Sequence, residues 1–333
     1  MATASMLAAP GAERTAVFPP GFGRRVLLTV DTEEEFDWKA PFRREGFGLS
    51  HIAAIPRFQA FCERIGAHPV YLVDWPVVHD RAAIEVIGDA VRRGTAEVGI
   101  QLHPWVNPPF EEEVSEHNSF AGNLSPALEA AKFTRLRDAI EAAFGTAPQI
   151  YRAGRYGLGP HTAELLLAAG VRIDTSVRSL FDYSHQGGPD YSHHPPLPYW
   201  VDDERRLLEL PVTSVYSGRL KQFGPMLHRV ERHLPTFYSG LSRFNLIERI
   251  ALTPEGVSAA EARRGIDLAL AAGLPVLVLS FHSPTLAPGH TPYAPTPEAV
   301  EQLYAWFAEV YAALAERGVK SCTVAEVIAA IGS

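Results

Sequence analysis

The sequence predicts an α/β fold, a distorted (β/α) barrel with about seven parallel strands. Short apolar segments rich in β-branched residues alternate with longer amphipathic segments along most of the chain. This alternation is typical of βα units built around a parallel sheet. The apolar segments carry almost no charge, as expected for strands that are buried on both faces. Seven such strands suit a closed or nearly closed barrel.

The first predicted strand is the segment RRVLLTVD, an apolar run that ends in an aspartate. Six similar segments follow, separated by stretches long enough to hold a helix. Several of them also end in polar or charged residues. The seven predicted strands span residues 24–31, 68–74, 96–103, 149–153, 171–176, 207–212 and 274–282.

Helices are predicted between the strands and after the last one. The clearest begins after Thr296, which is a favourable N-cap residue, with Pro297 at its first position. Apolar residues then recur at helical spacing, and Gly318 follows the end of the pattern. The predicted helices span residues 51–65, 76–93, 126–144, 160–169, 256–272 and 297–317.

The pattern indicates one domain. Residues 1–23 mix Ala, Gly and Pro without periodicity, which predicts a flexible lead-in. Residues 24–333 contain no internal repeat and no low-complexity linker, so we expect a single barrel. The longer irregular segments are interpreted as loops that decorate this barrel: 32–50, 104–125, 177–205 and 213–255.

Charge and composition exclude several classes of partner. The 333 residues include 30 Lys and Arg against 38 Asp and Glu, a formal net charge of −8, without a basic run. Nucleic acid and anionic membranes are therefore not expected partners. The two cysteines, Cys62 and Cys322, fit neither a disulfide framework nor a zinc ribbon. We find no membrane span and no signal-peptide pattern, and expect a cytoplasmic protein.

Chemically versatile side chains follow the predicted strands at one end of the barrel. Asp31 ends the first strand and Glu33 follows it, His103 ends the third, Arg152 lies in the fourth, and His282 ends the last. The carboxyl ends of parallel strands meet at one edge, which is where such folds place their sites. Carboxylates and imidazoles gathered there predict a hydrolytic or metal-assisted site.

Two further residues are candidates for contact with a substrate. Trp105 offers a flat apolar face that suits a pyranose ring, although a large aromatic residue can equally serve only in packing. Arg152 and Arg155 flank a glycine. We expect one of these arginines to pair with a carboxylate and Arg155 to contact a polar substrate.

Six segments together resemble the polysaccharide deacetylase superfamily (NodB homology, carbohydrate esterase family 4), and are most similar to its WalW-like branch. The resemblance runs from about Arg25 to Thr323. It implies a distorted (β/α) barrel that removes acetyl groups from N-acetylated sugars with a metal, usually zinc, held by an aspartate and two histidines. The segments are LLTVDTEEEFDW, EVGIQLHPWVNPPF, YRAGRYGLG, VRIDTSV, LELPVTS and LSFHSPTLAPGHTPY.

The resemblance also implies roles for three residues. Asp31 matches the general base of the family, Arg152 matches the arginine that orients this base, and His282 matches the late histidine that acts as the acid.

The carboxylate ligand of the family's metal is replaced in this sequence. Thr32 stands where the second aspartate of the first motif is expected. Glu33 or Glu34 is then the nearest carboxylate that can point the same way along an extended segment. We expect Glu33 to bind the metal.

The histidine ligands also differ from the family pattern. One alignment of the second motif places Gln101 and Trp105 at the two histidine positions, and the other places His103 and Asn107 there. Neither restores His-x-x-x-His. We expect His103 to be a ligand, with a carbonyl oxygen of Gln101 or Asn107 beside it. An amide oxygen is a poorer zinc ligand than an imidazole.

The sequence therefore predicts a metal-dependent hydrolase, with zinc as the expected ion. Its substrate would be an N- or O-acetylated sugar in surface polysaccharide or lipopolysaccharide biosynthesis. The alternative is a non-catalytic carbohydrate-binding relative that has lost the metal site. A third hypothesis is a metal-free hydrolase in which paired carboxylates such as Asp31 and Glu33 perform the acid–base chemistry.

Overall fold

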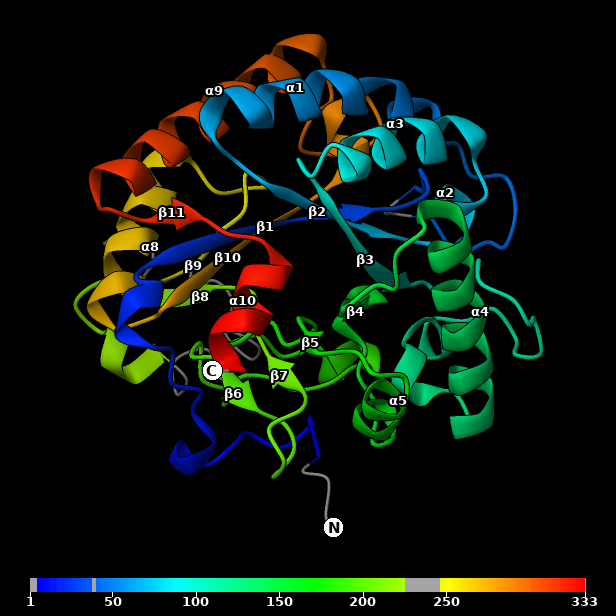
Figure 1. Cartoon of the computed structure of the whole chain (residues 1–333), viewed down its shortest axis with the longest axis horizontal. Helices are drawn as coiled ribbons and strands as arrows, with labels where there is room; N and C mark the ends of the chain where they lie inside the picture. Colours follow the sequence, from blue (N-terminus) through cyan, green and yellow to red (C-terminus); the bar gives the residue numbers. More distant parts are fainter. Residues whose placement is uncertain (1–4, 38–39, 225–245, 333) are drawn as a thin grey trace.

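Seven parallel strands form one curved sheet in the order β10-β1-β2-β3-β4-β5-β7 (Figure 1). The structure, a computed structural model, describes residues 5–37, 40–224 and 246–332. The seven strands coincide with the seven predicted ones, and the predicted fold class is confirmed. They are β1 (Arg25–Thr32), β2 (Pro69–Val73), β3 (Glu97–Leu102), β4 (Ile150–Ala153), β5 (Ile173–Asp174), β7 (Leu208–Glu209) and β10 (Val276–His282).

Two short strands extend this sheet, and two others form a separate ribbon. β6 (Tyr199–Trp200) pairs antiparallel with β7, and β11 (Lys320–Ser321) pairs parallel with the start of β1. The ribbon consists of β8 (Ser214–Ser217) and β9 (Glu248–Ala251).

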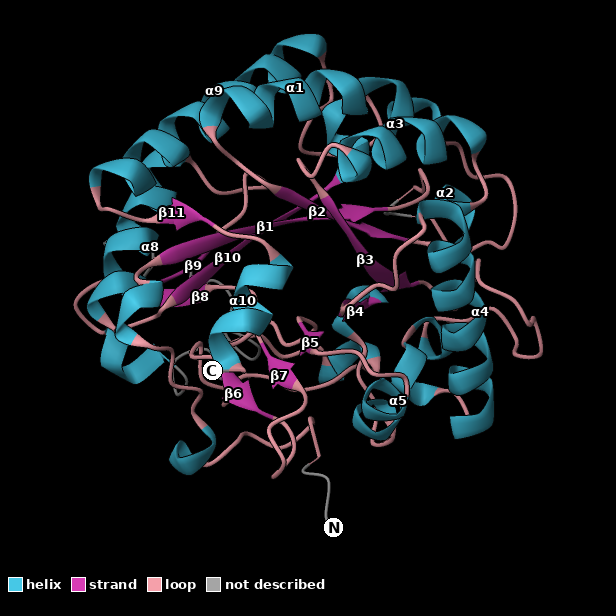
Figure 2. Cartoon of the chain, in the orientation of Figure 1, coloured by secondary structure: helices cyan, strands magenta, loops and turns pink. Residues whose placement is uncertain are grey.

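Most of the helices lie on the outer side of the sheet (Figure 2). All the predicted helices are confirmed, except that the one expected at 76–93 is two helices. Asp80 interrupts it, because its side chain caps the second helix by accepting a hydrogen bond from Ala83 N. The outer helices are α1 (Ile55–Ile65), α2 (Trp75–Val78), α3 (Arg81–Arg92), α4 (Pro126–Phe144), α5 (Thr162–Ala168), α8 (Ala259–Ala271) and α9 (Pro297–Glu316).

The interior of the curved sheet has an apolar end and a polar end. Near the amino ends of the strands, inward side chains such as Leu27, Ile150 and Val278 form an apolar cluster. Helix α10 (Val324–Ile331), which was not predicted, contributes Val327 to this cluster. Two residues further along β4 the inward side chain is Arg152, which is buried among hydroxyl groups. The site therefore lies above a packed apolar floor.

Backbone hydrogen bonds close the gap between the two edges of the sheet. Thr213, which follows β7, donates from its N–H to Val278 O of β10 at 3.2 Å. Ser280 N in turn donates to Leu252 O at 3.1 Å, and Leu252 N donates to Thr213 O. The sheet thus curls into a half-barrel whose open side is bridged by irregular segments.

Residues 5–23, predicted as a flexible lead-in, lie against the barrel. Met6, Ala16 and Phe22 are buried, and Ala16 N donates to Pro198 O at 2.9 Å. Arg14 donates to Val201 O at 3.0 Å.

Of the other predictions, Trp38 of the first motif and residues 225–245 of the loop 213–255 lie outside the described residues. No described helix is long and apolar enough to cross a membrane.

Two buried carboxyl groups face each other on β5 and β7. Asp174 and Glu209 are register partners, and both are fully buried. Asp174 accepts hydrogen bonds from Ser176, and Glu209 accepts one from Val177 N at 3.1 Å, so the pair fixes the start of the loop after β5. Burial and then the proximity of Asp174 raise the pKa of Glu209 well above its ordinary value of 4.5. The folded protein therefore retains a proton here that the unfolded chain releases.

This proton predicts a loss of stability as the pH rises. Because the pKa of Glu209 is higher in the folded state, its contribution is complete below about pH 4.5 and is lost as the pH rises through the folded pKa. Glu209→Gln keeps an acceptor for Val177 N and removes the titration. Between about pH 4.5 and the pKa of Glu209 in the folded state, we expect the free energy of unfolding of the unmodified chain to fall relative to that of the variant. The expected fall is up to about 1.4 kcal/mol per pH unit.

Urea titrations of both proteins at several pH values measure this difference. A pH-independent difference between them would contradict the assignment of the buried proton to this pair.

Candidate active site

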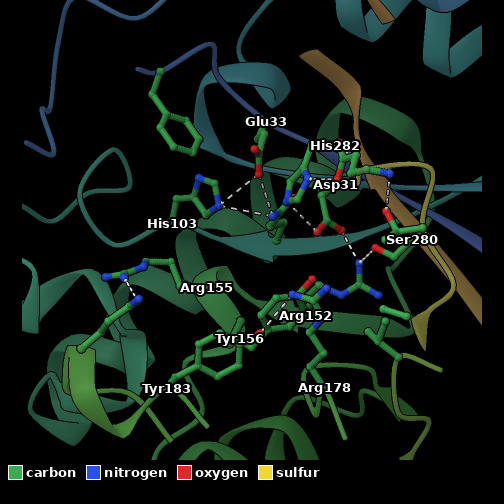
Figure 3. Close-up of a pocket in the computed structure, with 18 of the residues that line it drawn as sticks. Asp31, Glu33, His103, Arg152, Arg155, Tyr156, Arg178, Tyr183, Ser280 and His282 are labelled. Carbon is green, nitrogen blue, oxygen red and sulfur yellow. Dashed lines mark hydrogen bonds and ion pairs between the residues drawn. The ribbon is translucent and has the colours of Figure 1, made fainter. Parts of the chain in front are cut away.

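A cavity of about 400 Å³ opens at the carboxyl ends of the strands. Figure 3 shows the side chains that point into it from several strands and loops. The structure brings the predicted catalytic, substrate-binding and metal-binding residues to this cavity, together with Gln101. Asn107, the other amide predicted as a metal ligand, does not line it, and its Nδ2 donates to Lys132 O at 3.0 Å. The cavity lining includes Asp31, Glu33, His103, Trp105, Arg152, Arg155 and His282.

Arg152 is the most extensively bonded side chain in this cavity. Its guanidinium forms an ion pair with Asp31. It also donates to Ser280 Oγ at 2.7 Å, to Thr29 Oγ1 at 2.9 Å and to Thr175 O at 3.0 Å. These partners lie on β10, on β1 and after β5, so the arginine connects three parts of the barrel. Both charged groups are almost completely buried, and each compensates the other.

His282 lies beside the same aspartate and is held by a second carboxylate. Its Nε2 is 3.7 Å from Asp31 Oδ2, and its Nδ1 is 2.7 Å from Glu255 Oε2. Glu255 Oε1 accepts hydrogen bonds from His282 N and from Thr285 Oγ1. Burial acts to lower the pKa of His282, but Glu255 and Glu33 outweigh burial and raise this pKa to about 10. The imidazole is therefore a cation at neutral pH.

Glu33, Gln101 and His103 converge beside this pair in the cavity (Figure 3). Gln101 Nε2 donates to Glu33 Oε2 at 3.0 Å, and His103 Nε2 is 3.4 Å from the same oxygen. Burial raises the pKa of Glu33 to about 8, against the opposing effects of His282 and His103. Glu33 Oε1 and Gln101 Oε1 are buried and have no hydrogen-bond partner among the described residues.

A second carboxylate group lies behind His103, away from Glu33. His103 Nδ1 is 2.9 Å from Glu34 Oε2 and 3.9 Å from Asp74 Oδ2. Trp105 Nε1 donates to Glu34 Oε1 at 2.7 Å, and the indole stacks on the imidazole with ring centroids 4.3 Å apart. These contacts fix the orientation of the His103 ring.

Two sets of atoms around His103 are therefore candidates for binding a metal. Ligand atoms of Glu34, Asp74 and His103 lie within 4.8 Å of one another. In that set, however, the carboxylate oxygens already accept hydrogen bonds, including one from Glu34 N to Asp74 Oδ2 at 3.0 Å. On the cavity side, Glu33 Oε1 and Gln101 Oε1 lack donors. A buried oxygen without a donor is stabilised by a nearby cation, so the cavity side fits an ion better.

Gly154, which follows β4, leaves room for His103. A Cβ atom at this position would lie 2.4 Å from His103 Cδ2 and 2.6 Å from Leu102 O, so only glycine fits. The next two residues, Arg155 and Tyr156, have left-handed backbone angles, with φ of 55° and 60°. Both line the cavity.

The two residues predicted to contact the substrate, Arg155 and Trp105, have different surroundings in the structure. Arg155 lines the cavity, with its guanidinium 4.1 Å from the Phe120 ring centroid. Trp105 also lines the cavity but is only 3% exposed, and its N–H is taken by Glu34. Its role as a sugar platform remains a prediction.

Sequence reasoning missed three residues of the site. Asp74 follows β2 and, like Asp31, is an acidic residue at the end of an apolar run. It could therefore have been predicted from the sequence by the same rule. Glu255 and Arg178 come from loops, where no periodicity or strand end marks them. Their position depends on how the loops fold over the barrel.

Solved structures share this fold. One described as a "putative polysaccharide deacetylase" from Mycobacterium smegmatis matches with a TM-score of 0.53 and 19% identity, over 97% of this chain and 95% of that one. A 4-alpha-glucanotransferase from Thermococcus litoralis matches with a TM-score of 0.52 and 12% identity, over 92% of this chain and 40% of that one. A GH57 branching enzyme from Thermococcus kodakaraensis matches with a TM-score of 0.50 and 13% identity, over 92% of this chain and 71% of that one.

At these identities the similarity establishes the fold, which is the one predicted from the sequence. No protein-family model and no curated protein sequence matches the chain. The assignment to the WalW-like branch stays a prediction.

The Glu255–His282 contact makes a direct prediction about proton binding. In Glu255→Gln the amide keeps an acceptor for His282 but removes the negative charge, so we expect the pKa of His282 to fall by about 1–3 units. NMR titration of the histidine ring protons of chelator-treated protein measures this pKa, with His79 as an internal control because it is an exposed residue that directly follows α2. An unchanged midpoint for His282 would show that Glu255 does not determine its charge.

Proposed function

We propose that this protein is a hydrolase that removes an acetyl group from an N- or O-acetylated sugar. The observation that carries the proposal is the placement of Asp31 and His282 side by side in one cavity, each fixed by a buried partner of opposite charge. A purely structural pair has no need for both a carboxylate and an imidazolium that face a cavity. The resemblance in sequence and the deacetylase-like fold support the same reaction.

Hydrolysis of an acetamide needs a base for water, a stabiliser for the oxyanion and an acid for the leaving nitrogen. Asp31 is the base in this proposal, and Arg152 is the positioning residue that holds its carboxylate. His282 is the acid, because its raised pKa keeps Nε2 protonated at neutral pH. Its distance of 3.7 Å from Asp31 Oδ2 lets both groups reach the same acyl group.

Glu33, His103 and the amide oxygen of Gln101 would hold a divalent metal, with zinc as the ion expected from the resemblance. When bound, such an ion polarises the acyl carbonyl and lowers the pKa of a water molecule. Glu33 must lose its proton to act as a ligand, because burial raises its pKa to about 8. In the tautomer of His103 whose Nδ1–H donates to Glu34, the lone pair of Nε2 is available to a metal beside Glu33.

Two alternatives are supported by particular observations. The absence of His-x-x-x-His from the sequence favours a carbohydrate-binding relative that no longer hydrolyses its ligand. The raised pKa of Glu33 beside Asp31 favours a metal-free hydrolase, in which a protonated carboxyl group replaces the ion.

Finer assignments rest on the sequence alone. We propose a single domain over residues 24–333, a cytoplasmic location and a substrate from surface polysaccharide or lipopolysaccharide biosynthesis. Trp105 and Arg155 are proposed as contacts for the sugar.

Acetate release from a panel of N- and O-acetylated sugars tests the proposed reaction. We expect turnover by the unmodified chain, loss of turnover on chelation, and a decrease of about 10²–10⁴-fold in Asp31→Asn, because the water then lacks its base. Asp138→Asn is the matched control, since Asp138 is exposed and pairs only with its neighbour Arg137 among the described residues.

Each other result favours a named alternative. Full activity of Asp31→Asn would exclude Asp31 as the base. Activity that survives chelation but not Asp31→Asn would favour the metal-free hydrolase. Sugar binding without acetate release would favour the non-catalytic relative.

A further inference from the structure

The cavity has two chemically different ends. One end holds the acid and base groups described above. The other end, across Arg152 in Figure 3, is built from two arginines and two tyrosines: Arg155, Tyr156, Arg178 and Tyr183. This second end has no part in the proposed proton transfers, so its composition needs another explanation.

Arg178 lines the cavity without a carboxylate partner. Its Nη1 donates to Tyr183 OH at 3.3 Å, and its guanidinium carbon lies 3.9 Å from the ring centroid of Phe181 and 5.4 Å from that of Tyr156. Among the described residues, Glu255 attracts the guanidinium from beyond ion-pair distance, and Nε is buried without an acceptor. A guanidinium has five N–H donors, and aromatic contacts compensate its charge only in part.

Arg155 is held mainly by neutral groups. Its two terminal nitrogens donate to Ser119 Oγ and Gln186 Oε1, each at 2.5 Å. Within the described ranges, its carboxylate neighbour is Glu116 at 3.6 Å, whose side chain is mostly exposed. An ion pair of this kind is well solvated and weak. The positive charge of Arg155 therefore also remains largely uncompensated at the cavity wall.

The backbone is strained where it presents this wall. Arg155 and Tyr156 are consecutive residues with left-handed φ angles, a conformation unfavourable for any residue with a Cβ atom. Tyr191 OH holds the segment in place by donating to Tyr156 O at 2.6 Å. Strain of this type persists where the surrounding structure enforces it, and it concentrates at functional sites.

We propose that the ligand of this cavity carries an anionic group, a carboxylate or a phosphate, which binds to Arg178, while Arg155 adds positive charge to the same end of the cavity. The planar donor fork of arginine matches either anion with two parallel hydrogen bonds. The substrate class is then an acidic or phosphorylated acetylated sugar, with its ring beside Tyr156 and Tyr183. This substrate class rests on the proposed function, whereas the anion contact rests on Arg178 and its surroundings.

Calorimetric titration of the purified 333-residue chain tests this inference with four probes. N-acetylglucosamine is neutral, N-acetylglucosamine 1-phosphate carries a phosphate, N-acetylmuramic acid carries a carboxylate, and inorganic phosphate carries no sugar. We expect at least one anionic sugar to bind about tenfold or more tightly than the neutral sugar, because charge-assisted hydrogen bonds form. The preference should shrink between about 50 and about 500 mM salt.

Variants locate the contact. Arg178→Gln should abolish the preference for the anionic sugar, because the anion then loses its guanidinium donors. Arg263→Gln is the matched control, because Arg263 is an exposed residue of α8 that pairs with Glu309, and it should bind like the unmodified chain. Arg178→Lys keeps the charge but not the fork, so an intermediate preference is expected. If circular dichroism shows that Arg178→Gln does not fold, the affinities of Arg178→Lys for the anionic and neutral sugars test the contact instead.

The outcomes separate the two proposals. Equal affinity for neutral and anionic sugars, an unchanged preference in Arg178→Gln, or no binding of any probe would overturn the anion contact. Binding of inorganic phosphate that depends on Arg178, with no acetate released from any sugar, would keep the anion contact and overturn only the proposed hydrolysis. The probe that shows the larger preference identifies the anion as carboxylate or phosphate.

Discussion

The buried ion pair between Arg152 and Asp31 is the constraint on which the rest of the site depends. A guanidinium inside a barrel is costly unless all its donors are satisfied, and here hydroxyl and carbonyl groups from β1, β10 and the segment after β5 satisfy them. Removing either partner would leave an unpaired buried charge, which costs about 3–5 kcal/mol. The same bonds hold together the parts of the barrel that surround the cavity, so the site and its support are one network.

Both histidines of the cavity are fixed in the same way. His103 and His282 each have Nδ1 within 2.9 Å of a buried carboxylate, Glu34 in one case and Glu255 in the other. This contact sets the ring orientation and leaves Nε2 directed toward the cavity. The surroundings of the two Nε2 atoms differ. His282 is closest to the ion-paired Asp31, whereas His103 faces Glu33, whose second oxygen has no donor among the described residues. One histidine is thus suited to donate a proton and the other to bind a cation.

The strands and most of the site could be predicted because both follow from local sequence. A fully buried parallel strand needs an uninterrupted apolar run, and the residue that follows it lies at the functional edge of the sheet. Asp31, Arg152 and His282 were found by this rule, and the same rule would have found Asp74. Glu255 and Arg178 could not be found, because loop residues reach the cavity through tertiary packing. Helix α10 was missed although Thr323 and Glu326 form a capping box at its start, so the sequence does carry a local signal for this helix.

The metal content of the purified protein, measured by elemental mass spectrometry after saturation with zinc and removal of unbound ion, tests the cavity most directly. Comparison of the unmodified chain with Glu33→Gln and Asp74→Asn separates the two candidate sets of ligands around His103. An ion held on the cavity side gives about one zinc per chain in the unmodified protein, retention in Asp74→Asn and loss in Glu33→Gln. Loss in Asp74→Asn with retention in Glu33→Gln, or no bound ion in any of the three proteins, would contradict a metal-assisted hydrolytic site in this cavity.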